Sequence, residues 1–106
     1  MKSYCFDIDG TLTEQHDDSP LEAVPRPERI ALVNKLFEEG ATVHLMTSRG
    51  MIKSEGDPKE AEEYMRSKTE EQLREWGVKY HRLYFGKPRV DLYVDDRGVN
   101  DMDFFK

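Results

Sequence analysis

Four short segments of the chain carry the aromatic, aliphatic and β-branched residues that are typical of buried strands. They cover residues 3–8, 42–46, 80–85 and 90–94. None of them contains glycine or proline, and polar residues or a turn signal such as Asp9-Gly10 follow each one. The pattern therefore predicts four strands.

Two longer segments between these strands have apolar residues at helical spacing. The first begins at Pro27, which suits the first turn of a helix, and stops before Gly40. The second begins at Asp57-Pro58, which resembles a cap followed by a first-turn proline, and stops before Gly77. We expect helices over residues 27–39 and 58–76.

The elements follow one another as strand, helix, strand, helix, strand and strand. This order favours an α/β fold of the three-layer, Rossmann-like kind, with a mainly parallel central sheet between helices. Residues 14–27 are polar, rich in proline and without a period, so they are expected to form a loop or flap. With 106 residues, the chain is predicted to be a single domain over residues 1–106.

Composition excludes several classes of function. The formal net charge of −6 makes a nucleic-acid partner unlikely by electrostatics, because such a protein needs a basic face. No apolar run is long enough to cross a bilayer, and the first residues do not form a secretory signal, so no membrane partner and a cytoplasmic location are expected. The single Cys5 cannot form an intrachain disulfide.

Acidic residues stand where two of the predicted strands end. Asp7 and Asp9 share one side of an extended segment, and Asp95 and Asp96 follow the last strand. Ligands in open parallel sheets bind beyond the carboxyl ends of the strands, so these carboxylates are expected to meet there. Their mutual repulsion requires protons or a cation, and oxygen ligands beside a phosphate favour Mg²⁺.

The same edge of the sheet carries groups suited to a phosphoryl group. Gly10 allows a sharp turn whose backbone N–H groups can receive phosphate oxygens. Thr47 or Ser48 can add a hydroxyl donor after the second strand, and Lys87 adds a positive charge after the third. A carboxylate at this site could attack phosphorus.

The ordered residues Asp7-Ile8-Asp9-Gly10-Thr11-Leu12-Thr13, Thr47, Lys87 and Asp95-Asp96 resemble the four motifs of the haloacid dehalogenase (HAD) superfamily. Residues 47–50, 72–78 and 85–88 further resemble small bacterial and phage members that are associated with capsule or surface-polysaccharide biosynthesis.

The superfamily resemblance implies a phosphatase that works through an aspartyl-phosphate intermediate. Asp7 would be the nucleophile, and Asp9 would protonate the leaving oxygen and then activate water. Thr47 and Lys87 would hold the phosphoryl group, with Gly10, Thr11, Ser48 and Arg49 as further substrate contacts. Asp7, the carbonyl of Asp9, and Asp95 would bind Mg²⁺ with support from Asp96, although adjacent residues point apart and the sequence leaves the choice between Asp95 and Asp96 open.

Members of the superfamily usually carry a cap over the site, and this chain has little room for one. A capless site is open, which suits a large substrate or a second subunit that covers the site, so a homo-oligomer is expected as one arrangement. The acidic charge places sugar phosphates or phosphorylated saccharides ahead of nucleic acids.

Three alternatives stay open. A receiver-like or other non-catalytic phosphate-binding module uses a similar set of acids with a hydroxyl group and a lysine, but receivers place the phosphorylated aspartate after a middle strand. A polynucleotide end phosphatase is a second option within the enzyme class. Arg49 could bind a substrate anion or pair with an acidic neighbour.

Overall fold

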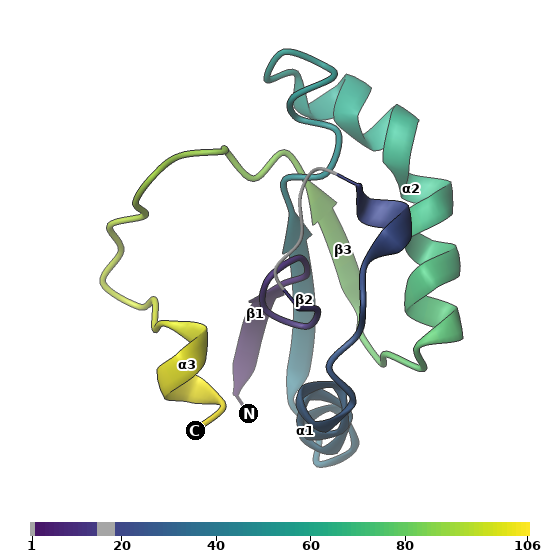
Figure 1. Cartoon of the computed structure of the whole chain (residues 1–106). Coiled ribbons are helices and arrows are strands. Elements are labelled where there is room, and N and C mark those ends of the chain that lie inside the picture. Colours follow the sequence, from purple (N-terminus) through teal and green to yellow (C-terminus); the bar gives the residue numbers. More distant parts are fainter. Residues whose placement is uncertain (1, 15–18) are drawn as a thin grey trace.

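Three parallel strands form the centre of the molecule. The computed structural model describes residues 2–14 and 19–106, so part of the expected flap, residues 15–18, lies outside the described residues. The strands are β1 (Ser3–Asp7), β2 (Thr42–Thr47) and β3 (Arg82–Phe85), in the order β1-β2-β3. Figure 1 shows them side by side with their carboxyl ends at one edge of the sheet. The expected α/β fold with a parallel, Rossmann-like sheet is confirmed.

Two helices connect these strands. Helix α1 (Pro27–Glu38) links β1 to β2, and α2 (Pro58–Glu75) links β2 to β3. Both begin with proline, and the side chain of Asp57 accepts hydrogen bonds from Lys59 N and Glu60 N at the start of α2. The two predicted helices are therefore present.

The hydrophobic core lies on one face of the sheet. In register across the three strands, Phe6, Leu45 and Leu83 point to the same side and are all buried. Both connecting helices pack there, through Ile30 and Val33 of α1 and Leu73 of α2. Of the three expected layers, the described residues thus form two, because successive right-handed crossovers in one direction place their helices on the same face.

The other face of the sheet is more open. Cys5 and Tyr84 are exposed there, and the His44 ring lies against that of Tyr84, with ring centroids 5.7 Å apart. No helix among the described residues contributes a side chain to a core on this face.

The prediction of a fourth strand over residues 90–94 is wrong for the single chain. The described sheet has three strands, and residues 86–100 contain neither helix nor strand. The physical reason is the connection: only residues 86–89 separate this segment from β3, whereas a parallel neighbour needs a crossover of about a dozen residues or more. Figure 1 shows the segment leaving β3 in a wide arc.

The chain then returns to β1 through the short helix α3 (Asp101–Phe104). Phe104 and Phe105 pack edge-on or tilted against the ring of Phe6, at centroid distances of 5.5 and 5.9 Å. Asp101 accepts a hydrogen bond of 2.7 Å from the buried Arg29 of α1. These contacts attach the end of the chain to the start of the sheet.

The described ends of the expected flap are held together. Thr13 and Pro25 form an antiparallel bridge, and Glu14 N donates to Val24 O at 2.9 Å. The short 3-10 helix η1 (Pro20–Glu22) lies between them in the chain. In the part of the chain that the structure describes, no helix is long and apolar enough to cross a membrane.

Candidate active site

A tight turn follows β1 and presents the first pair of acids. Asp7 ends the strand, and the backbone N–H groups of Thr11, Leu12 and Thr13 all point to Ile8 O, at 3.2, 2.8 and 3.2 Å. Gly10 has a φ of 82°, in the left-handed region that favours glycine. The buried side chains of Ile8 and Leu12 anchor the turn to the core.

Asp7 faces a lysine from another strand end. Lys87 follows β3, and its Nζ lies 3.7 Å from Asp7 Oδ1. Burial raises the pKa of Asp7, and the charge of Lys87 opposes that rise without cancelling it. The side chain is nevertheless 30% exposed, so a small molecule can reach it. Asp7 is therefore a partly desolvated carboxyl group next to one cation.

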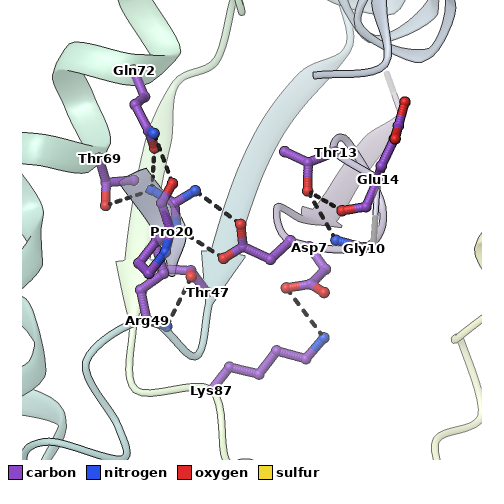
Figure 2. Close-up of polar contacts among 11 residues, drawn as sticks. Asp7, Gly10, Thr13, Glu14, Pro20, Thr47, Arg49, Thr69, Gln72 and Lys87 are labelled. Atoms are coloured by element: carbon purple, nitrogen blue, oxygen red, sulfur yellow. Dashed lines mark hydrogen bonds and ion pairs between the residues drawn. The ribbon is translucent and has the colours of Figure 1, made fainter. Parts of the chain in front are cut away.

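Asp9 forms a two-point ion pair with Arg49. Figure 2 shows the Arg49 side chain with dashed contacts toward Thr69 and Gln72. Arg49 Nε donates to Asp9 Oδ2 at 2.8 Å, and Nη2 donates to Oδ1 at 2.9 Å. The remaining nitrogen, Nη1, donates to Thr69 Oγ1 at 3.2 Å and to Gln72 Oε1 at 2.6 Å. These bonds use four of the five N–H donors of a guanidinium that is 2% exposed. Arg49 thus holds Asp9 and ties it to α2.

The two hydroxyl groups after β2 occupy different environments. Thr47 is 1% exposed, and its Oγ1 accepts the backbone N–H of Arg49 at 3.0 Å. Ser48 instead lines the open cleft beside Asp7 and Asp9. Of the two candidate donors, the single chain presents Ser48 to a ligand and keeps the Thr47 hydroxyl in a local backbone contact.

The turn residues predicted to contact substrate are also divided. Gly10 lines the cleft, and its N–H donates to Thr13 Oγ1 at 3.1 Å. Thr11 does not line it, and its carbonyl accepts a hydrogen bond from Arg29 at 2.9 Å. Gly10 therefore lies with the candidate site, whereas Thr11 links the turn to α1.

The single chain does not bring the second acid pair to the first. Asp95 lies in the arc, where its Oδ1 accepts the backbone N–H of Arg97 at 3.2 Å, and this contact lowers the pKa of Asp95. Asp96 is 83% exposed and lies 3.7 Å from Arg97 Nε. Over residues 2–14 and 19–106, no group of three or more acidic, histidine or cysteine side chains could hold a metal ion. Asp7 and Asp9 therefore supply only part of the predicted magnesium site.

An open cleft of about 1030 Å³ spreads from these acids over the start of α2. Its lining adds residues that the sequence reasoning missed: the cations Lys53, Lys68 and Arg89, and the aromatic Tyr64 and Tyr93. Lys53 Nζ lies 4.7 Å from the ring centre of Tyr64, and Lys87 Nζ lies 4.5 Å from that of Tyr93. Arg89 lies four residues after β3 and Lys53 six residues after β2, in loops at the carboxyl edge of the sheet, a position that could have drawn attention to them.

Comparison with solved structures finds similarity at low sequence identity, including similarity to HAD-like phosphatases. A crystal structure from Vibrio cholerae superposes with a TM-score of 0.89 at 28% identity and covers 99% of this chain and 88% of the other. The arc after β3 is therefore within the aligned region.

Two larger proteins share the core at lower similarity. D,D-heptose 1,7-bisphosphate phosphatase from B. bronchiseptica, complexed with magnesium and phosphate, has a TM-score of 0.54 at 23% identity. A protein from Mesorhizobium loti described as a HAD-like phosphatase has the same TM-score at 26% identity. This chain, covered to 79% and 76%, spans 49% and 39% of their lengths. The sequence matches no known family profile, and no curated protein is similar to it at a significant level.

Proposed function

We propose that the chain is a phosphomonoester hydrolase in which Asp7 is the nucleophile. The observation that carries the proposal is the position of Asp7: a partly buried carboxyl group at the carboxyl end of β1, 3.7 Å from Lys87 and at the wall of an open cleft. Similarity to HAD-like phosphatases supports the same class of reaction.

In the first step, a carboxylate oxygen of Asp7 attacks the phosphorus, and the bond from phosphorus to the leaving oxygen breaks. The leaving oxygen takes a proton from Asp9. Lys87 lies close enough to Asp7 to balance charge on the phosphoryl oxygens, whereas the N–H groups of the turn at Gly10 donate within the turn itself. The product is an aspartyl phosphate on Asp7 and a free alcohol.

In the second step, water attacks the same phosphorus atom, Asp9 takes the proton from that water, and the bond to Asp7 breaks to release phosphate. The ion pair with Arg49 favours the ionised form of Asp9, which suits this role as a base. As an acid in the first step, Asp9 must carry a proton, and its carboxyl group must then loosen its contact with Arg49.

Magnesium belongs to the proposal as the cation that would neutralise the acids and the phosphate. Asp7 and Asp9 are oxygen donors of the kind that Mg²⁺ prefers. Within one chain, however, the described residues do not complete the set of Mg²⁺ ligands, so neither step above assigns the ion a role.

For the substrate we propose a phosphorylated sugar or saccharide. Lys53, Lys68 and Arg89 provide positive charge along the cleft, and Tyr64 and Tyr93 offer rings on which a sugar can pack. A role in surface-polysaccharide biosynthesis follows only from the motif resemblance and stays a part of this proposal.

The test is an Asp7→Asn variant, assayed with a panel of phosphorylated sugars, nucleotides and oligonucleotides in Mg²⁺. Turnover should be abolished, and acid-quenched wild-type protein should carry one phosphoryl group on Asp7. Asp57→Asn is the matched control, because it makes the same substitution at a helix cap where asparagine serves equally well.

The outcomes separate the alternatives. Full activity of Asp7→Asn would refute the proposal. Stable phosphorylation of Asp7 without turnover would favour a receiver-like module. Preference for oligonucleotides, with activity that falls steeply with salt, would favour the polynucleotide end phosphatase.

A further inference from the structure

The arc between β3 and α3 exposes an unusual amount of apolar surface. Among the described residues, eleven large hydrophobic side chains are exposed; five of them lie in the arc and a sixth lies in α3, which follows it. They are Val90, Leu92, Tyr93, Val94, Val99 and Met102. Val94 reaches 90% exposure and Leu92 75%. So many exposed large apolar side chains within one short segment indicate a contact with another molecule more than a solvated loop.

Strand β1 has an edge that could pair with this apolar segment. In the part of the chain that the structure describes, β1 pairs with β2 and with no other strand. Its second edge therefore presents backbone N–H and C=O groups that can accept another strand. This edge ends at Asp7, the proposed nucleophile.

The chain cannot place its own residues 90–94 on that edge in the orientation the site needs. To bring Asp95 beside Asp7, the segment must run parallel to β1 and therefore start at the amino end of the sheet. From β3, that start lies three strand spacings sideways and, by the registers of Phe85 with Thr47 and of Met46 with Asp7, about six residues back, a direct distance of about 24 Å.

The connection is too short for this path. The Cα atoms of Phe85 and Val90 can be at most about 18 Å apart in an extended chain. The path must also pass over one face of the sheet, which lengthens it further. An antiparallel placement avoids the crossing but carries Asp95 to the far end of β1, away from Asp7.

A second copy of the chain removes this constraint. Figure 1 shows the arc running from the carboxyl end of the sheet back toward its amino end, opposite to β1. A two-fold axis perpendicular to the strands reverses that direction, so the arc of one copy runs parallel to β1 of the other. The same rotation also places the arc of the first copy parallel to β1 of the second, so the two contacts are equivalent, as in an isologous dimer.

We propose that two copies exchange residues 90–94, each adding a parallel strand to β1 of the other and placing its Asp95 beside the partner's Asp7. The exchange brings the exposed apolar residues of 90–94 against another strand, and it supplies an acid that the described residues of a single chain lack for the metal site. The strand exchange stands independently of the chemistry. The role of Asp95 as a magnesium ligand rests on the proposed function.

The sole cysteine offers a direct test. Cys5 is exposed on β1, and aligning Asp95 with Asp7 places Tyr93 of the other copy opposite Cys5. Adjacent strands bring such residues about 5 Å apart, within the range that a disulfide spans. Mild oxidation of Tyr93→Cys should therefore give a covalent dimer on a non-reducing gel, whereas Val24→Cys, a surface position on another segment, should give far less.

The mass of the product decides between the arrangements. A disulfide within one chain, at monomer mass, would overturn the proposal, as would a lack of any Tyr93→Cys product under conditions that oxidise other exposed thiols. Sedimentation at micromolar concentration is the second measurement. Wild type and Val24→Asp should sediment as dimers, and Val94→Asp should shift toward monomer. A monomeric wild type would also overturn the exchange.

Complementation tests the shared site. Asp7→Asn and Asp95→Asn should each be inactive alone, but unfolding and refolding them together should restore about a quarter of wild-type activity. Half of the random dimers are mixed, and each mixed dimer holds one site with both native acids. No restored activity, with the disulfide dimer formed, would retain the exchange and remove Asp95 from the site. An inactive wild type, with the disulfide dimer still formed by Tyr93→Cys, would refute the proposed function alone.

Discussion

Removal of the Arg49 charge should destabilise the protein far more than removal of a surface charge. In Arg49→Met the apolar stem keeps most of its volume, while Asp9 loses two charged hydrogen bonds and Thr69 and Gln72 lose one each. Removing one partner of a fully buried pair costs about 3–5 kcal/mol, and because Asp9 is 26% exposed the value belongs below this range, at about 2–3 kcal/mol. The fully buried Thr69 hydroxyl adds about 1 kcal/mol. The sum is about 3–4 kcal/mol.

Urea denaturation at one fixed protein concentration measures this loss, since dimer formation would otherwise shift the midpoint. Lys79→Met is the matched control: its ion pair with Glu38 is equally short at 2.7 Å, but the two side chains are 47% and 61% exposed. We expect a loss below about 1 kcal/mol there.

The double variant Asp9→Asn/Arg49→Met sharpens the test. Because it also removes the charge left without a partner, it should be more stable than Arg49→Met alone. A loss of stability in Arg49→Met no larger than that of the Lys79→Met control would show that the ion pair with Asp9 does not stabilise the fold. The reasoning is also refuted if the double variant is the less stable of the two, because the ion pair would then not explain the loss.

Two further predictions concern Asp7 and the loop after β2. Burial raises the pKa of Asp7, so ionising this carboxyl group lowers the stability of the folded state. The stability provided by the protonated carboxyl is fully present below the usual carboxyl pKa and is lost as the pH rises through the raised pKa. Asp7→Asn should thus be more stable than wild type at neutral pH and converge with it in acid, as urea midpoints across pH will show; a less stable variant at neutral pH would contradict this. Gly50→Ala would place Cβ 2.9 Å from the backbone of Ala61 at a φ of 81°, whereas Gly56→Ala, at a φ of 87°, meets nothing within 4 Å. Thermal denaturation should show a loss of about 1–2 kcal/mol for Gly56→Ala and clearly more for Gly50→Ala, and equal losses would argue against the close packing of the loop on α2.

Local pattern was sufficient for most of the fold. The helices α1 and α2 were predictable because proline, glycine and the spacing of apolar residues mark their ends and their buried sides, and these signals act within a few residues. Strands β1, β2 and β3 were predictable because their runs of buried residues lie between clear turn signals. The positions of Asp7, Asp9 and Lys87 at the carboxyl edge follow from the same order of elements.

The sequence alone could not show which strands pair with one another. Residues 90–94 have a strand's composition, but a strand exists only beside another strand, and the length of the connection to β3 decides which one is within reach. For the same reason the sequence could not say whether Asp95 lies near Asp7.

Side-chain contacts were the other open question. Arg49 was equally suited to a substrate or to an acidic neighbour. Only the approach of Asp9 from the turn after β1, and of Thr69 and Gln72 from α2, settles which of its donors are in use. Thr47 and Ser48 are adjacent in the sequence, yet the Thr47 side chain is buried and Ser48 lines the cleft. The sequence by itself thus determined the elements and the chemistry at the edge of the sheet, because both depend on near neighbours in the chain. The tertiary structure decided which charges meet and which edge stays open, because those depend on distances between residues far apart in the chain.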